Sequence, residues 1–449
     1  MISMDKLLLQ TKTYLQTLQQ SQRNGLFQCA RVSRAVGLAL EAKGFYQPVG
    51  ARCWVKIDRK TRVEAEVVGF DQDAVYLMSI NHIHGIAAGM PIIPSGKVAQ
   101  VKASEQMLGR VLNGAGDPVD GKSPIHGGEA YSLMTSPINP LQRALIQAPM
   151  NVGVRAINAL LTVGQGQRIG LFAGSGVGKS VLLGMMTRYT SADVVVIGLI
   201  GERGREVREF IEHSLGEEGR RRAIVVAAPA DESPLMRLHG AMVATSIAEY
   251  FRDKGKNVLL LMDSLTRFAQ AQREIALSVG EPPATKGYPP SVFSRLPQLV
   301  ERAGNGKEGS GSITAFYTVL TEGDDPHDPI ADASRAILDG HIVLSRELAE
   351  SGQFPAIDLE ASISRVMPNV VPDQQLQQAI VFKKYLSLYQ RNRDLISLGV
   401  YKPGSDADLD KAIASWPAMR NFIAQHMHES VSLEQSCEAL TELINQLKA

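Results

Sequence analysis

Residues 165–180 combine the residue types that bind phosphate, in the sequence Gln-Gly-Gln-Arg-Ile-Gly-Leu-Phe-Ala-Gly-Ser-Gly-Val-Gly-Lys-Ser. Glycines in such a loop let backbone N–H groups converge on phosphate oxygens. Lys179 can reach the β- and γ-phosphates of a nucleotide, and the Ser180 hydroxyl can ligate Mg²⁺. The pattern predicts a P-loop, although Ala173 stands where the motif has its first glycine. The predicted nucleotide contacts in this stretch are Gly174, Ser175, Gly176, Val177, Gly178, Lys179, Ser180 and Val181.

Two elements must flank this loop if it is to hold phosphate. The apolar residues Ile169, Leu171 and Phe172 predict a buried strand before the loop, and residues 181–186 predict the start of a helix after it. The N-terminus of a helix carries a partial positive charge that attracts phosphate. A glycine-rich turn with an incidental Lys-Ser pair is the alternative, but the flanking strand and helix are what the motif requires.

A second group of polar residues follows another apolar run, residues 194–200. Such a run is typical of a strand that is buried on both faces of a parallel sheet. It ends at Gly201, and ligands of open α/β sheets bind at the carboxyl ends of the strands. Glu202 could therefore orient and polarise a water, and Arg203 could stabilise transferred charge. A strand that merely ends in surface charges is the alternative interpretation.

A third apolar run, residues 258–262, ends in Asp263. This is the Walker B pattern, in which the carboxylate holds Mg²⁺, here through a water. Apolar strands that end in Asp are common in α/β proteins. The P-loop upstream favours the functional interpretation.

The composition limits the class of protein. A chain of 449 residues can form two or three domains, and a net charge of +1 does not favour a nucleic-acid binder. The three cysteines, Cys29, Cys53 and Cys437, lack metal-site spacing and indicate a reducing cytosol. No apolar run approaches membrane-spanning length, so we expect any membrane association to be peripheral.

The sequence pattern divides the chain into four segments. Residues 1–24 contain an amphipathic helix with Leu7, Leu8, Tyr14, Leu15 and Leu18 on one face, which either packs on its own domain or docks a partner. Residues 25–96 show short, turn-separated strands that predict a β-barrel. Residues 97–368 form the predicted P-loop ATPase domain, beginning with a turn-rich linker around residues 108–118, and residues 369–449 are a predicted helical domain.

With these three motifs, the chain resembles the catalytic subunits of rotary ATPases, and most closely the flagellum-specific ATPases of the type III export apparatus. The resemblance covers almost the whole chain, and it is strongest at residues 170–186, 196–210, 260–273, 281–304 and 312–367. It implies a RecA-like α/β P-loop NTPase core with an N-terminal β-barrel and a C-terminal helical domain. The catalytic glutamate of the family is matched by Glu202, whereas non-catalytic partner subunits carry Gln there.

The resemblance also implies further site residues. Arg267 matches an arginine near the γ-phosphate, and Arg365 lies in a segment similar to the one that donates an arginine finger to the neighbouring subunit. Phe354 matches the position where an aromatic ring packs on adenine. Tyr401 lies where relatives supply a second ring, but its surroundings diverge.

The family comparison implies an ATP- and Mg²⁺-dependent homohexamer that assists export of flagellar proteins. A stator-like regulator would bind the N-terminal helix, a coiled-coil stalk protein would enter the central pore beside residues 281–290, and export chaperones with their cargo would dock near the C-terminal domain. An export gate at the membrane is a further implied partner. The protein would be cytoplasmic and peripherally associated with the inner membrane at the flagellar base.

Four alternatives are considered. A virulence-type III secretion ATPase is disfavoured by the P-loop sequence, residues 174–179, which looks flagellar. An ATP synthase catalytic subunit is disfavoured because Glu202 and Arg365 stand on one chain. A hexameric RNA translocase would need a basic N-terminal domain with exposed aromatic residues, which residues 27–95 lack. A non-catalytic scaffold does not explain why Lys179, Glu202 and Asp263 are all present.

Overall fold

The computed structural model describes residues 29–80, 85–321 and 328–448. The predicted N-terminal amphipathic helix lies outside these residues. The described part of the chain separates into two compact units. One comprises the residues up to Ala99 together with Ile275–Glu281, and the other comprises Gln100–Glu274 and the residues from Pro282 onward.

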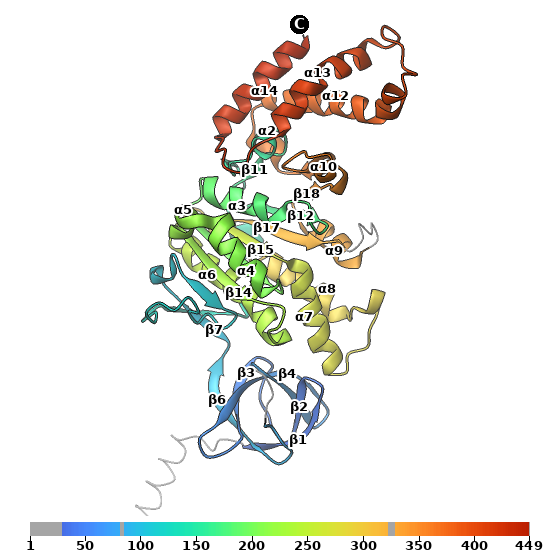
Figure 1. Cartoon of the computed structure of the whole chain (residues 1–449). Helices are drawn as coiled ribbons and strands as arrows, with labels where there is room; N and C mark the ends of the chain where they lie inside the picture. The colour runs from blue at the N-terminus through green and yellow to red at the C-terminus, as the bar shows by residue number, and fades with distance from the viewer. Residues whose placement is uncertain (1–28, 81–84, 322–327, 449) are drawn as a thin grey trace, which may run out of the picture. The chain divides into compact units, whose positions relative to one another are not determined.

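Six strands of the first unit close into a barrel in the order β1–β2–β5–β4–β3–β6 (Figure 1). Their bounds are β1 Ala30–Val36, β2 Ala39–Lys43, β3 Ala51–Lys56, β4 Arg62–Asp71, β5 Ala74–Ser79 and β6 Pro91–Val98. Side chains alternate between the two faces of a strand, so Val55, Val67 and Leu77 are buried inside while Lys56 and Arg62 are exposed. The predicted β-barrel is confirmed.

A sheet of nine strands organises the second unit. Its order is β19–β18–β12–β17–β15–β13–β14–β8, with β16 pairing β17. The bounds are β8 Val111–Asn113, β12 Arg168–Ala173, β13 Val194–Ile200, β14 Ala223–Ala228, β15 Asn257–Asp263, β16 Gly304–Asn305, β17 Ser312–Leu320, β18 Gly340–Leu344 and β19 Ile357–Ser364. All pairs from β18 to β8 are parallel, and β19 and β16 pair antiparallel.

Helices cover both faces of this sheet, which explains why its central strands are apolar throughout. Every residue of β13 is buried. Side chains of Val195, Ile197 and Leu199 belong to the same core cluster as α3, Lys179–Tyr189. On the opposite face lies α6, Pro234–Asp253, where a Cβ at Gly198 would contact Ala244. The predicted α/β core is therefore confirmed.

One segment differs from its prediction. Residues 108–118 were expected to be a linker, but β8 within them joins the central sheet as an edge strand, paired with β14. Only three residues pair, and the turn after them is held by the Asn113 side chain, which accepts from the N–H groups of Ala115 and Asp117. A strand of this length between turn residues leaves no clear alternation in the sequence.

The C-terminal helices lie side by side, in orange and red in Figure 1. They are α12 Asp373–Ser397, α13 Ala407–Ile423 and α14 Leu433–Lys448. The helix α2, Arg155–Leu160, contacts this group through the buried amide of Asn158, which donates to the carbonyl of Val431. The P-loop domain and the C-terminal helices therefore share hydrogen bonds and core packing.

Shorter elements complete the unit. The helices are α4 Gly204–Glu209, α5 Gly216–Arg221, α7 Leu265–Ser278, α8 Pro290–Val300, α9 Pro329–Ile337, α10 Arg346–Glu350 and α11 Met367–Val370, with 3₁₀ turns at Glu105–Met107, Pro140–Gln142 and Thr285–Gly287 and a π-helical turn at Phe210–Leu215. Two small sheets pair β7 Gln100–Ala103 with β9 Glu129–Ser132 and β10 Pro149–Met150 with β11 Val163–Gly164. Among the described helices, none has both the length and the apolar character needed to cross a bilayer.

Candidate active site

The predicted P-loop connects β12 to α3. Two of its glycines, Gly176 and Gly178, have φ angles of 81° and 87°, a region that residues with a Cβ rarely adopt. No side chain caps the N-terminus of α3. Because the first N–H groups of a helix have no partner within the helix, this end offers donors to an anion.

Lys179, Glu202 and Asp263 meet at the carboxyl ends of three strands. Lys179 is the first residue of α3, after the P-loop that follows β12; Glu202 comes two residues after β13; and Asp263 is the last residue of β15. The Lys179 Nζ lies 2.6 Å from Oδ1 of Asp263 and 3.4 Å from Oε1 of Glu202. The three side chains are only 12%, 14% and 6% exposed for Lys179, Glu202 and Asp263. Three residues that the sequence predicted from separate motifs therefore form one cluster.

The cluster perturbs the titration of its members. Burial raises the pKa of Glu202 to about 7, and the charges of Asp263 and Glu206 add to this rise while Lys179 opposes it. Burial disfavours the charged form of Lys179, but the adjacent carboxylates outweigh this effect, so the pKa of Lys179 is raised. Glu202 can thus exchange a proton near neutral pH, as a water-activating base requires.

Arg267 crosses the end of β13 at Gly201. A Cβ at Gly201 would lie 2.8 Å from both Cβ and Cγ of Arg267, so the side chain passes where only glycine leaves room. Arg267 donates from one terminal nitrogen to Oε1 of Gln270 at 2.7 Å, while its buried Nε has no hydrogen-bond partner. A buried donor without a partner is costly, which fits a group that binds an anionic ligand.

A cavity of about 710 Å³ is lined by Lys179, Glu202 and Arg267, but not by Asp263, which hydrogen-bonds to Lys179. The predicted residues that line it are Gly174, Ser175, Gly176, Gly178, Lys179, Ser180, Val181, Glu202, Arg203 and Arg267. The same cavity is also lined by residues that no sequence motif predicted: Glu206, Thr266, Gln270, Thr321 and Arg346. Glu206 could have been suspected, because it lies one helical turn after Glu202 at the start of α4.

A second, apolar cavity of about 320 Å³ lies beside the P-loop. Phe354 lines it together with Val177 and Val181. The remaining wall includes Gln425, His426 and Met427, from the loop between α13 and α14, which the sequence analysis did not identify. This loop is tied to the site because the Gln425 N–H donates to the carbonyl of Phe354 at 3.0 Å.

Two predicted residues do not join this arrangement. Tyr401 lies between α12 and α13, and its hydroxyl donates to Oδ1 of Asp410. Tyr401 lines neither cavity. Arg365 follows β19, is exposed, and donates to the carbonyls of Leu338 and Arg335. Its side chain is therefore on the surface of its own subunit, apart from the cavity around Lys179.

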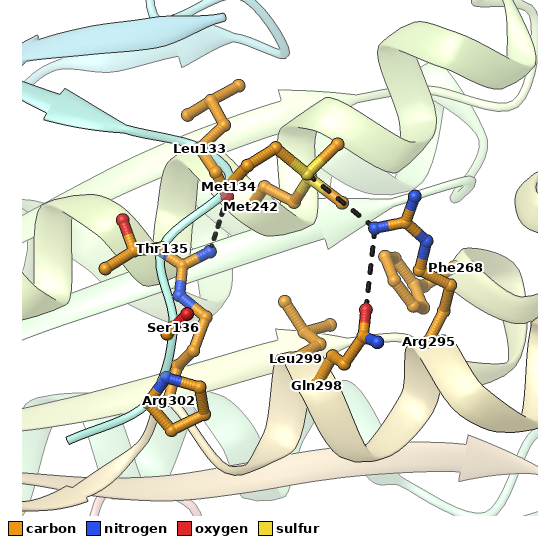
Figure 2. Close-up of a pocket in the computed structure, with 11 residues that line it drawn as sticks. Leu133, Met134, Thr135, Ser136, Met242, Phe268, Arg295, Gln298, Leu299 and Arg302 are labelled. Carbon is orange, nitrogen blue, oxygen red and sulfur yellow. Dashed lines mark hydrogen bonds between the residues drawn. The ribbon is translucent and has the colours of Figure 1, made fainter. Parts of the chain in front are cut away.

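Figure 2 shows residues that line a different cavity, of about 310 Å³, whose wall includes residues 133–137. Arg302 donates to the carbonyl of Leu133 and to the carboxylate of Glu249, and its side chain is 3% exposed. This charge is fully paired, as a structural ion pair should be. None of the predicted site residues lines this cavity, so it is not the candidate active site.

The residues around Lys179 fit a nucleotide with Mg²⁺. The unpaired Nε of Arg267 and the uncapped N-terminus of α3 suit phosphate oxygens, and Phe354 with its apolar neighbours suits a base. Ser180 and Asp263 supply oxygen ligands, which a hard cation prefers.

Comparisons with known proteins agree with this geometry. Residues 153–364 match the model of the ATP synthase alpha/beta family, nucleotide-binding domain, and residues 371–442 match that of the T3SS EscN ATPase C-terminal domain. The flagellum-specific ATP synthase of Pseudomonas aeruginosa is 60% identical over 92% of each protein. The one of Salmonella typhimurium is 58% identical over 91% of this chain and 92% of the relative.

Type III secretion proteins are also similar. The type 3 secretion system ATPase of Xanthomonas euvesicatoria is 47% identical over 92% of this chain and 93% of the relative. The structure of the assembled ATPase EscN from enteropathogenic E. coli has a TM-score of 0.88 and 44% identity, covering 92% of this chain and 100% of that one. The predicted family resemblance is confirmed: the chain belongs to the family of the flagellum-specific ATP synthases and is an ATPase of the flagellar and type III secretion kind.

Proposed function

We propose that the protein hydrolyses ATP with Mg²⁺ at the cavity around Lys179, in a homohexameric ring that assists the export of flagellar proteins. The observation that carries this proposal is the meeting of Lys179, Glu202 and Asp263 within 3.4 Å. A cation, a base with a raised pKa and a metal-holding carboxylate are the groups that phosphoryl transfer to water needs.

Each residue has a distinct task in this proposal. Lys179 turns from its two carboxylates to the β- and γ-phosphates, which carry more charge. Glu202 then orients a water and accepts its proton. Arg267 and Arg203 donate to phosphate oxygens as charge moves toward the leaving group. Ser180, and Asp263 through a water, would hold Mg²⁺, which would supply positive charge to the phosphates. The remaining backbone amides of the P-loop bind the phosphates, and Phe354 packs on the base.

Arg365 completes the site from a neighbouring copy. Its exposed position, apart from the cavity of its own chain, supports a role in trans. An arginine suits this task because its guanidinium stays charged and can spread hydrogen bonds over a phosphoryl group. The assembled form of EscN, a protein 44% identical to this chain, supports a ring.

The same comparison supports a stalk partner, since EscN has been solved with its central stalk EscO. We propose a corresponding coiled-coil stalk for this protein, and a stator-like regulator on residues 1–24. Export chaperones with cargo at residues 369–449 and an export gate at the membrane complete the proposed partners. The proposed location is the cytoplasmic side of the inner membrane at the flagellar base.

Mixing two inactive variants tests the proposal. Arg365→Ala and Glu202→Gln should each hydrolyse ATP slowly while binding nucleotide. In a mixed ring, some interfaces place an intact Glu202 opposite an intact Arg365, so phosphate release should recover in part.

The matched control mixes Arg365→Ala with the double variant Arg365→Ala/Glu202→Gln, in which no interface holds an intact arginine. Recovery should be absent there. If the first mixture forms mixed rings, detected by two different affinity tags, and still recovers nothing, Arg365 does not act in trans.

A further inference from the structure

Thr318 is a buried polar residue that the proposed chemistry does not use. It lies in β17, which pairs with β12 on one side and β15 on the other. Its side chain is 0% exposed. The Oγ1 atom is 2.6 Å from Oδ1 of Asp263 and 3.3 Å from the carbonyl oxygen of Met262. The hydroxyl therefore reaches the end of the strand that carries the metal-holding carboxylate.

The hydroxyl has two acceptors but only one proton. An ionised carboxylate accepts hydrogen bonds and cannot donate them, so a bond between Thr318 and Asp263 requires the threonine to be the donor. Hydrogen bonds to a charged acceptor are shorter and stronger than those to a carbonyl. The distances of 2.6 Å and 3.3 Å therefore indicate that the Thr318 hydroxyl donates its hydrogen bond to Asp263 and not to the Met262 carbonyl.

Lys179 and Thr318 both donate to the same oxygen, Oδ1. Among the described residues, the side-chain hydrogen bonds to Asp263 are both to Oδ1, so Oδ2 would be the oxygen available to a water on Mg²⁺. The two donors differ in freedom: the Lys179 ammonium sits at the end of a flexible chain, whereas Thr318 is fixed within the central sheet. Once Lys179 turns to phosphate, Thr318 is the donor that still holds the carboxylate.

We infer that Thr318 is a positioning residue that orients the Asp263 carboxylate for Mg²⁺. This inference rests on the proposed role of Asp263 at the metal. Partners in the second shell of a metal site orient its ligands, and their loss costs roughly 10–100-fold in metal affinity or activity. A threonine that merely satisfies its own buried hydroxyl at the Met262 carbonyl would have no such effect.

The test compares two pairs of side chains in which one member has the hydroxyl and the other lacks it: wild-type Thr318 with Thr318→Val, where a methyl group replaces it, and Thr318→Ser with Thr318→Ala. Mn²⁺ is titrated into the full-length protein with bound ADP, and free Mn²⁺ is followed by electron paramagnetic resonance. Removing the hydroxyl should weaken Mn²⁺ binding by roughly tenfold or more in both pairs. Thr318→Ser should retain affinity to within about threefold of wild type.

Two further measurements separate the explanations. ADP affinity without metal should stay unchanged in all four proteins, because Thr318 acts only through Asp263. Asp263→Asn tests the proposed metal role itself: unchanged Mn²⁺ affinity in this variant would overturn that role. If Asp263→Asn loses Mn²⁺ while Thr318→Val and Thr318→Ala bind it like their hydroxyl-bearing partners, only the inference about Thr318 fails. If Thr318→Val does not fold, the serine and alanine pair decides.

Discussion

The Nζ of Lys179 lies 2.6 Å from Oδ1 of Asp263, although the two residues are 84 positions apart in the chain. Lys179 opens α3, and Asp263 closes β15. The Lys179 ammonium pairs closely with the buried carboxylate of Asp263 and, at 3.4 Å, with that of Glu202. The cation of the P-loop is thus a structural partner as well as a phosphate ligand.

We expect Lys179→Ala to abolish tight binding of Mg²⁺–ATP and its hydrolysis. The substitution removes the phosphate ligand and leaves two buried carboxylates without their cation, which is costly. Binding of a fluorescent ATP analogue and release of phosphate are the measurements. Lys254→Ala is the control, because Lys254 forms an exposed ion pair with Glu129 and should matter little. Unchanged hydrolysis in Lys179→Ala would exclude this cavity as the active site.

Glu202→Gln should keep nucleotide affinity and lose turnover by roughly two to four orders of magnitude. The amide has the shape of the carboxylate but is a much weaker base. Steady-state kinetics and nucleotide binding are measured on the same preparation, with Glu209→Gln as control, since Glu209 pairs with Arg205 at the surface. Equal losses of binding and turnover would instead assign Glu202 a structural role.

The pH dependence of kcat/KM should report the raised pKa of Glu202. Burial first, and then the charge of Asp263, raise this pKa to about 7. Since the base must be ionised, kcat/KM should fall as the pH drops below about 7, by about tenfold per unit well below it. Glu206→Gln removes a neighbouring charge that raises the pKa of Glu202, so the acidic limb of the pH profile should move to lower pH. A limb that moves to higher pH would contradict the assignment.

Gly201→Ala should slow hydrolysis through Arg267. The new Cβ would meet the Arg267 side chain at 2.8 Å, and the backbone φ of +69° strains any residue with a Cβ. A displacement of about 1 Å in a charge-stabilising group can cost up to roughly a hundredfold in rate. Gly204→Ala is the matched control, because nothing lies within 4 Å of a Cβ there. Equal kinetics for the two variants would show that Arg267 tolerates displacement.

The local parts of the site could be predicted from the sequence. These parts are the P-loop, the strand before Glu202 and the strand that ends in Asp263. Each is a contiguous stretch whose residue types have known chemical roles. A buried parallel strand is apolar along its whole length, so residues 194–200 and 258–262 were visible without a structure.

Other parts depend on the order of strands in the sheet, which no local pattern contains. Thr318 contacts Asp263 across 55 residues because β17 lies next to β15, and nothing in the sequence distinguishes it from Ser312 and Thr314, the other small hydroxyl residues of that strand. Tyr401 is assigned to the nucleotide from family position alone, and its hydroxyl bond to Asp410 is a contact that no sequence pattern predicts.

The sequence alone determined which residues could hold phosphate, metal and water, because those roles require particular side chains at short spacing. Only the tertiary structure decided which distant residues contact these predicted site residues. The wall around Phe354 formed by Gln425, His426 and Met427 arises because a loop of the C-terminal helices is hydrogen-bonded to the Phe354 carbonyl. Such contacts are set by packing between elements, and packing depends on the whole chain rather than on any segment.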